Sequence, residues 1–243
     1  MYNQIIKEIL THKNGQKAKL LSGFFKTGIG QYGEGDIFLG ITVPISRKIA
    51  QKYGNVELSI VSKLIKNKYH EIRLIALLIL VHKYKKLSTG SNTPNLNEKK
   101  KIVDFYLVHT KYINNWDLVD LSASYILGDY LTIVRQDLTT KILSKLVRSK
   151  NIWERRIAVI STFAFIYKKD NKWTFKTVDN LMMDEHDLIH KACGWMLRET
   201  GKRVSEKELI SYLDTNSHKM SRTMLRYAIE RLPENKRQYF LNK

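Results

Sequence analysis

The sequence contains few cysteines and few prolines, and each shortage restricts the class of protein. Its single cysteine, Cys193, lies in the apolar run HKACGWML, so an internal disulfide is excluded. This usage is typical of a reducing compartment, and we expect a cytoplasmic protein in which Cys193 is a small buried hydrophobic residue. The three prolines, Pro44, Pro94 and Pro233, each stand where a helix can begin or end.

Long apolar segments are also missing. No run of about 18 consecutive apolar residues occurs, so we expect no membrane-spanning helix. The first residues, MYNQIIKEILTHK, mix Lys and Glu with apolar side chains and do not form the apolar core of a secretory signal. No basic amphipathic anchor stands out, so we expect no membrane partner.

Acidic residues are scarce compared with basic ones. The chain has 42 Lys and Arg against 23 Asp and Glu, a formal net charge of +19, and the excess is spread along its whole length. This distribution indicates a basic surface built by the fold. A polyphosphate binds such a surface favourably through charge attraction and counterion release, so nucleic acid is the expected partner.

The 243 residues are 43% hydrophobic and 10% aromatic, as in a folded globular protein. Apolar residues recur at three- and four-residue spacing through most of the chain, and strand-like alternation is scarce. The polar stretch SNTPNLNEKKK interrupts this rhythm, but the same pattern continues beyond it, so we interpret it as a loop. The sequence therefore predicts one all-α domain over residues 1–243.

Four segments resemble one another and indicate an internal repeat. Each begins with polar or charged residues and continues as an apolar helix, and their starts lie roughly 34 to 46 residues apart, the spacing of stacked helix pairs. We predict a helical-repeat solenoid with a concave basic face. The segments begin at His70 (HEIRLIALLILVHKYKK), Trp116 (WDLVDLSASYILGDYL), Trp153 (WERRIAVISTFAFIYKK) and Asp187 (DLIHKACGWMLRETGKR).

The stretch KTGIGQYGEGDIFLGI contains four glycines within eight residues, Gly28, Gly30, Gly33 and Gly35. A dinucleotide or P-loop site does not fit, because the preceding strand and the following Lys-Ser or Lys-Thr are missing. Two interpretations remain open: a hairpin or tight loop that brings backbone close to another surface, and a plain loop between helices.

The pair of histidines in HDLIH, His186 and His190, imitates one turn of a zinc-protease helix. Asp187 is shorter than the glutamate that such a site uses as its base, and no third ligand is evident. We therefore expect no metal and no cofactor, and interpret the two histidines as polar residues at a helix start.

The stretch NNWDLVD places two aspartates beside a tryptophan. Asp117 follows Asn114 and Asn115 in the first turn of the predicted helix, where a carboxylate satisfies backbone donors and meets the positive end of the helix dipole. Asp120 lies beyond this cap. It is four residues after Trp116 and therefore shares its face, so either function or an ion pair with a basic neighbour explains it.

Four motifs in this order, FFKTGIGQYGEGDIFLGITVPISRKIA, NNWDLVD, NIWERRIAV and HKACGWMLRE, resemble the AlkD-like DNA glycosylases of the DNA alkylation repair family. The resemblance covers nearly the whole chain. It implies a HEAT-like α-solenoid that excises cationic N3- or N7-alkylated purines from double-stranded DNA in base excision repair. Members of this family act on a base that stays stacked in the duplex, and the resemblance implies a monomer without a cofactor.

The resemblance assigns roles by motif. Asp120 would be the catalytic carboxylate, which stabilises the positive charge that grows on the deoxyribose and orients the water. Trp116 and Trp195 would pack their rings against the sugar and its backbone. Arg156 would hold a phosphate beside the lesion. The alternatives are a core aromatic for Trp195 and a solvated helix residue for Arg156.

Two features depart from the active type. Phe24 stands at the DNA- or lesion-contacting position where the best-known active type carries a tyrosine, and the glycine-rich stretch before Phe38 resembles an insertion found in only part of the family. Some members with such features bind DNA, including branched forms, without excising alkylpurines, so the resemblance implies a non-catalytic binder of branched or distorted DNA as the alternative function. A scaffold for acidic proteins is disfavoured, because it gives no reason for the four shared site residues to occur together.

We predict that this protein binds duplex DNA without requiring a particular sequence, and that the affinity falls steeply with salt. Each phosphate contact contributes roughly 0.9 to the slope of log affinity against log salt concentration. Titrations by fluorescence anisotropy from low to high salt measure that slope. Binding that does not change with salt would contradict the interpretation of the +19 charge.

Overall fold

The computed structural model describes residues 1–88 and 95–243, and these residues form an all-α protein. They contain no strand, and their only β contact is an isolated bridge between Ile37 and Tyr69. The predicted all-α helical-repeat fold class is confirmed. The first residues of the predicted connector, through Pro94, lie outside the described residues. The rest of that stretch is largely helical, because Asn95 caps a helix by accepting the Glu98 backbone N–H at 3.1 Å.

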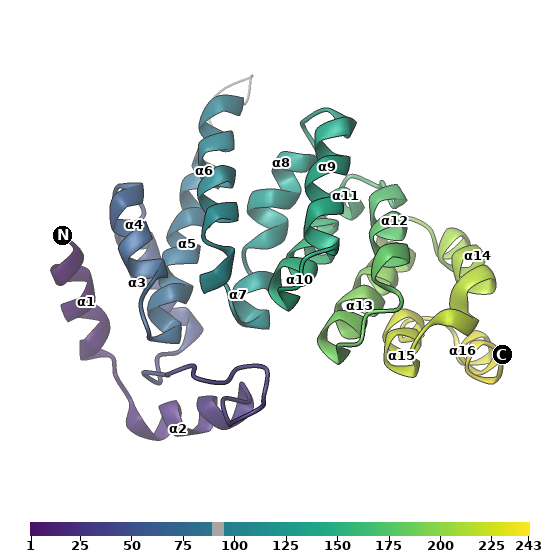
Figure 1. Ribbon diagram of the computed structural model, residues 1–243, viewed down its shortest axis with the longest axis horizontal. Coiled ribbons are helices and arrows are strands. Elements are labelled where there is room, and N and C mark those ends of the chain that lie inside the picture. The colour runs from purple at the N-terminus through teal and green to yellow at the C-terminus, as the bar shows by residue number, and fades with distance from the viewer. Residues whose placement is uncertain (89–94) are drawn as a thin grey trace. The chain divides into compact units, whose positions relative to one another are not determined.

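The chain folds as two compact units, Met1–Ile126 and Leu127–Lys243, and each is described by itself. The first unit begins with short helices on either side of the glycine-rich loop (Figure 1). Its α-helices are α1 (Tyr2–Thr11), α2 (Gly15–Phe24), α3 (Val43–Lys52), α4 (Leu58–Ile65), α5 (His70–Lys86), α6 (Leu96–Val108) and α7 (Trp116–Asp120), with a 3-10 turn at Thr110–Tyr112.

The second unit is helical throughout its length, and its helices are joined by short loops (Figure 1). Its helices are α8 (Asp129–Leu131), α9 (Gln136–Val147), α10 (Ile152–Ser161), α11 (Phe163–Tyr167), α12 (Lys172–Leu181), α13 (Asp187–Arg203), α14 (Glu206–Asn216), α15 (Arg222–Ile229) and α16 (Glu234–Asn242), with a 3-10 turn at Ser217–Lys219. A π-helical segment, Ser124–Gly128, precedes α8.

Each unit is organised around one long helix. Helix α5 packs against α3, α4, α6 and α7, and α13 packs against α10, α11, α12, α14 and α15. Thirteen of the seventeen residues of α5 are buried, so this helix is surrounded on all sides, as expected for a central element. Both central helices are segments that the sequence predicts to be repeat equivalents.

The same local structure recurs at the starts of α5, α10 and α13. In each, a side-chain acceptor receives the backbone N–H two residues later at 2.9–3.0 Å. A side-chain nitrogen six residues later then donates to the backbone carbonyl of the first residue at 2.5–3.0 Å. The three sets are Asn67–Tyr69–Arg73, Ser149–Asn151–Arg155 and Asp184–His186–His190. This shared entry into the helix supports the predicted equivalence of three of the four segments.

The fourth segment, which begins at Trp116, differs from the prediction. The expected continuous helix ends at Asp120, passes through a turn, and continues as the π-helical segment Ser124–Gly128. Ser122 explains the break, because its hydroxyl donates to the carbonyl of Leu118 at 2.6 Å and contacts the Tyr106 hydroxyl at 3.0 Å. A serine that bonds back to the preceding turn in this way bends or interrupts a helix.

A buried carboxylate connects the end of the glycine-rich loop to α5. Glu71 is 2% exposed and accepts three backbone N–H groups, from Leu39 and Gly40 at 2.8 Å each and from Ile41 at 3.1 Å. Gly40 has φ of +82°, and a Cβ there would lie 2.0 Å from the backbone oxygen of Asn14. The segment therefore needs glycine for its path and Glu71 for its hydrogen bonds.

We predict that Glu71→Gln lowers the free energy of unfolding by about 2–3 kcal/mol, because the amide turns a donor toward at least one buried N–H group. Urea unfolding followed by circular dichroism measures the change. Glu57→Gln is the control: this exposed side chain contacts only Ser59, and its replacement should change stability by less than about 0.5 kcal/mol. Equal losses in the two variants would contradict the role of Glu71.

Candidate functional site

The short helix α7 carries two of the predicted site residues, and its start is fixed by a capping residue. Asn115 is fully buried, and its side-chain oxygen accepts the backbone N–H of Trp116 at 2.8 Å. Asp117 follows in the first turn and accepts the Leu118 N–H at 2.8 Å. The predicted helix start at this position is confirmed.

The Trp116 ring is half-buried and lies on an aromatic cluster contributed by the end of α2 and the loop after it. It stacks on Phe25, with ring centres 5.2 Å apart, and Phe25 in turn stacks on Phe38 at 5.0 Å. Phe24 meets the edge of Trp116 at 6.0 Å and is 63% exposed. The structure therefore brings Phe24 and Trp116 together, with Phe24 open to solvent.

The indole N–H of Trp116 donates to the hydroxyl of Tyr32, in the glycine-rich loop, at 3.3 Å. Stacking on one side and this hydrogen bond on another restrict the ring in two directions. An aromatic ring held in this way has little rotational freedom, so the half-buried Trp116 presents a fixed apolar surface.

Behind the aromatic cluster lies a buried ionic chain that sequence reasoning missed. The His70 imidazole, at the start of α5, contacts Asp36 through Nδ1 at 2.8 Å and Asp117 through Nε2 at 2.9 Å. The side chains of His70 and Asp36 are each 2% exposed and that of Asp117 is 17% exposed. Asp117, explained from sequence as a helix-start residue alone, therefore also joins α7 to α5.

Arg73 and Asn115 complete the chain of contacts around Asp36. The Arg73 guanidinium pairs with the Asp36 carboxylate, and the Asn115 amide donates to the same carboxylate at 3.3 Å. Burial by itself raises the pKa of Asp36, but the His70 and Arg73 contacts outweigh it and hold that pKa below its usual value. Burial lowers the pKa of His70, but the two carboxylates outweigh it and raise that pKa to about 9.

The glycine-rich stretch is a folded loop of consecutive turns, and no hairpin forms in it. Gly33 approaches the backbone so closely that a Cβ would lie 2.4 Å from the Phe25 carbonyl oxygen and 3.5 Å from the Asn115 amide. Gly30 and Gly35 have φ of +74° and +79°. The interpretation as a tight loop with close backbone approach is the one that the structure supports.

Asp120 ends α7 on the face of Trp116 and is half-buried. Burial raises the pKa of the Tyr106 hydroxyl, and the negative charge of Asp120 raises it further, which places that charge near this buried phenol. The Asp117 charge is matched by His70.

Arg156 and Trp195 belong to the second unit, on α10 and α13, which pack against each other. Arg156 is 5% exposed and donates through Nη1 to the backbone carbonyl of Leu188 at 2.6 Å. The alternative of a solvated helix residue is therefore wrong. The position one earlier, Arg155, pairs with Asp184 at 2.6 Å, a contact that sequence reasoning also missed.

Trp195 is half-buried and is not a fully covered core aromatic. Its ring lies 5.9 Å from the Phe163 ring, and the Phe163 ring is tilted against Tyr167 with ring centres 4.6 Å apart. Directly before it, Gly194 lets α13 pack against α15, because a Cβ there would lie 2.4 Å from the Met224 carbonyl oxygen. The Trp195 ring itself lies beside Phe163 of α11.

The histidine pair of HDLIH has hydrogen-bonding roles at the start of α13. His186 accepts the Leu188 N–H at 3.1 Å, and His190 donates to the Asp184 carbonyl. Over residues 1–88 and 95–243, no group of three or more His, Cys, Asp or Glu side chains is arranged to hold a metal ion.

Cys193 is buried, and burial raises the pKa of its thiol, as expected for a small core residue. Within the same ranges, no helix has the length and apolar composition that crossing a bilayer requires.

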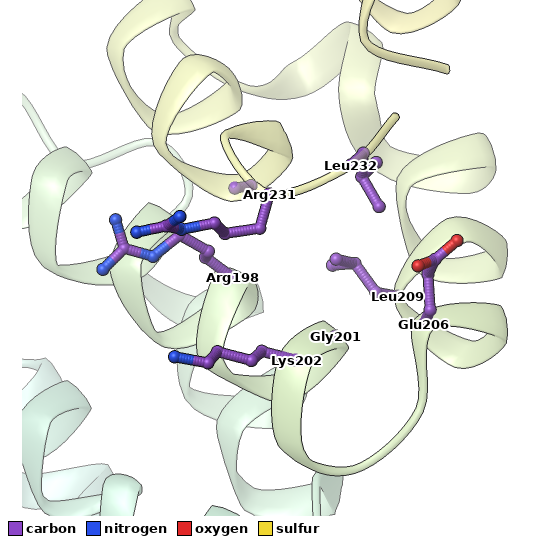
Figure 2. A pocket seen from close by; sticks show the side chains of 8 residues that line it. Arg198, Gly201, Lys202, Glu206, Leu209, Arg231 and Leu232 are labelled. Atoms are coloured by element: carbon purple, nitrogen blue, oxygen red, sulfur yellow. The ribbon is translucent and has the colours of Figure 1, made fainter. Parts of the chain in front are cut away.

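A pocket of about 220 Å³ in the second unit contains none of the predicted site residues. Figure 2 shows the charged ends of Arg198, Lys202 and Arg231 on one side of it and Glu206 on the other. Glu230 pairs with Arg198 at 2.5 Å, so part of this positive charge is neutralised. The pocket offers no pair of groups for acid–base or nucleophilic chemistry.

Comparison with known proteins identifies the family. A family model described as "DNA alkylation repair enzyme" matches residues 5–232. The chain belongs to the DNA alkylation repair enzyme family. Among solved structures, it is similar to a predicted DNA alkylation repair enzyme from Enterococcus faecalis, with a TM-score of 0.66, 17% identity, and coverage of 92% of this chain and 98% of that one. At this identity the likeness concerns the fold. No curated protein matches the sequence.

Membership in the DNA alkylation repair enzyme family makes DNA the substrate and repair of alkylation damage the process. The buried chain Asp36–His70–Asp117 of this DNA alkylation repair protein was not found from sequence. Its members are separated by 34 and 47 residues, and only Asp117 had an explanation from sequence, as a helix-start residue. The sequence held only a weak sign of this buried chain. A histidine and a glutamate stand at the start of a largely apolar repeat segment, HEIRLIALLILVHKYKK.

We predict that Gly33→Ala lowers the free energy of unfolding by about 1–3 kcal/mol and changes the environment of Trp116, because the new methyl group would collide with backbone at Phe25. The measurements are urea unfolding and the Trp116 fluorescence, taken as the difference from Trp116→Phe. Gly28→Ala is the control, since its methyl would meet only the movable end of the Gln31 side chain. A Gly33→Ala protein that behaves like this control would contradict the proposed close approach.

Proposed function

We propose that this protein is a DNA glycosylase that excises cationic N3- or N7-alkylated purines from duplex DNA, without extruding the base. The proposal rests on the restrained, half-exposed Trp116 ring of α7 and on Asp120, which lies four residues later in the same helix and therefore shares its face by helix periodicity. The family match over residues 5–232 supports the process, DNA alkylation repair.

The chemistry of the lesion determines what the protein has to supply. Alkylation at N3 or N7 makes the purine cationic and a good leaving group, so little general-acid assistance is needed. Positive charge then grows on the deoxyribose as the glycosidic bond breaks. A fixed carboxylate stabilises this charge, and it is worth most where water is partly excluded. Asp120 is proposed for this role and for orienting the water that attacks C1′.

The aromatic residues are proposed to contact the sugar and the backbone around the lesion. Trp116 presents a restrained ring whose face attracts developing positive charge. Phe24, exposed beside it, extends the apolar surface without the hydroxyl that a tyrosine would add. Trp195, half-buried beside Phe163, is proposed as the second sugar-contacting aromatic.

Arg156 is proposed to contribute to phosphate binding near the lesion, and it is the least accessible member of the set. Its Nη1 atom already holds the Leu188 carbonyl at the start of α13. Its replacement is therefore expected to affect the packing of α10 against α13 as well as DNA binding, and it is a poor single test of the phosphate contact.

A second function is favoured by a specific observation in the glycine-rich loop. Ile29 is 95% exposed, an unusual position for a large apolar side chain, and the loop contacts Trp116 through Tyr32. Apolar side chains of this kind wedge into distorted or kinked DNA. A non-catalytic binder of branched DNA would use this loop for shape recognition. Tight binding to branched DNA without release of any alkylpurine would support it over the glycosylase.

We predict that Asp120→Asn reduces the rate of 7-methylguanine release by about 100- to 1000-fold, because it removes the charge that opposes the oxocarbenium ion. Binding to undamaged duplex should persist or tighten, since a carboxylate near phosphates repels them in the ground state. Single-turnover release from duplex containing 7-methylguanine and anisotropy titrations measure the two effects.

The matched control for this test is Asp104→Asn, an exposed aspartate of the same unit that pairs with Lys100. It should leave both release and binding at the wild-type level. An Asp120→Asn protein that releases 7-methylguanine as fast as this control would end the catalytic assignment. Loss of stability together with loss of binding would instead identify Asp120 as a structural ion-pair partner.

A further inference from the structure

The His70 imidazole is enclosed by groups that require it to donate two hydrogen bonds. Nδ1 lies 2.8 Å from the Asp36 carboxylate and Nε2 lies 2.9 Å from the Asp117 carboxylate. A carboxylate accepts and does not donate, whereas a neutral imidazole has only one N–H. With both aspartates ionised, the geometry is satisfied only by an imidazolium, in which both ring nitrogens carry a proton.

The charged groups around the ring balance one another. Asp36 faces His70 from the glycine-rich loop, Asp117 faces it from α7, and Arg73 lies one turn along α5 and pairs with Asp36. Two negative and two positive charges therefore form a neutral set that is almost fully enclosed. Glu71, the next residue of α5, is directed instead to the backbone N–H groups of Leu39, Gly40 and Ile41. Removing one member would leave another buried charge unmatched.

The same ring also belongs to the aromatic cluster that supports Trp116. His70 stacks on Phe38 at 4.4 Å and lies 5.1 Å from Phe25, the ring on which Trp116 rests. Asp117, its Nε2 partner, is the residue directly after Trp116 in the chain. His70 therefore reaches Trp116 by two routes, through the backbone of α7 and through the stacked rings.

We propose that His70, held as an imidazolium between Asp36 and Asp117, is a positioning residue that fixes Trp116 and the first turn of α7 relative to the glycine-rich loop. It does not touch DNA, because it is fully enclosed. Its effect on base release rests on the proposed function, in which the ring of Trp116 contacts the sugar. Its effect on the position of Trp116 does not depend on that function.

The direction of the pH dependence follows from the surroundings of the ring. The pKa of His70 is raised from 6.5 to about 9, so the unfolded chain loses this proton before the folded one does. The stabilisation by the imidazolium is complete below the unfolded value, declines between the two values, and is lost as pH rises through about 9. The position of Trp116 should change over the same upper range.

The first experiment measures the protonation of His70 in the intact protein by long-range ¹H–¹⁵N correlation of the histidine rings. The His70 signal is identified in the wild-type protein by its nuclear Overhauser contacts with the Phe38 ring, on which His70 stacks at 4.4 Å. We expect both ring nitrogens to carry protons at pH 7.5 and the ring to become neutral only near pH 9. A neutral His70 ring at pH 7.5 would overturn the proposal, and this measurement does not require any variant to be stable.

The second experiment follows Trp116 by ¹⁹F NMR after incorporation of 5-fluorotryptophan, with the signal assigned through Trp116→Phe. As pH rises, the Trp116 resonance should shift with the same midpoint as the His70 titration. This pH-dependent shift should be missing in His70→Gln. His109→Gln is the matched control: His109 is also buried in the first unit, but it bonds to Ser62 and Phe105 and should leave the step intact. A Trp116 resonance that does not shift over the pH range in which His70 titrates would contradict the positioning role.

The third measurement connects the position of Trp116 to activity. His70→Gln should slow release of 7-methylguanine by about 100-fold, the typical cost of a small misplacement of a contacting group, with little change in affinity for undamaged duplex. Release at the His109→Gln rate would overturn the functional part of the proposal. If the wild-type protein releases no base at all, the proposed glycosylase function fails, while the two NMR experiments still decide whether His70 positions Trp116.

Discussion

The first unit depends on how charges are buried at the start of α5. In a chain with a net charge of +19, the two carboxylates that are most deeply enclosed there, Asp36 and Glu71, have separate partners. Glu71 satisfies three backbone N–H groups of the segment that leads into α3, and Asp36 is matched by His70 and Arg73. Because an unmatched buried charge is costly, these contacts require one arrangement of loop and helix. The aromatic cluster under Trp116 forms on that arrangement.

The second unit has the same hydrogen-bonding pattern at its helix starts, but the arginine of that pattern pairs with a different carboxylate. Arg155 repeats the contacts of Arg73, with Nη1 on the carbonyls five and six residues earlier, and its carboxylate partner is Asp184. Asp184 itself begins the next equivalent turn, at the start of α13. The starts of α10 and α13 are thus connected through the Arg155–Asp184 ion pair. In the first unit the corresponding arginine has been joined to the glycine-rich loop.

These constraints affect how the proposed site would act. Asp117 has its charge matched by His70, whereas Asp120, three residues later, shares the face of a restrained tryptophan. A short helix with this start holds the ring and the carboxylate at one spacing, so the proposed reaction would need little reorganisation of these two groups. Ser122 interrupts the helix after Asp120, so α7 has only five residues. In so short a helix, the cap at Asn115 determines the direction of the helix axis.

The sequence by itself determined the all-α class, the helix positions, the repeat segments at His70, Trp153 and Asp187, and the family to which the four motifs point. These features arise from periodicity, capping residues and ordered motifs, all of which are local along the chain. Only the tertiary structure decided the burial of Arg156, the break after Asp120 and the chain Asp36–His70–Asp117. Each of these depends on groups brought together from separate helices and loops. Asp117 is already explained by its place in the first turn of a helix. Its second partner, His70, lies 47 residues away and cannot be inferred from the local sequence pattern.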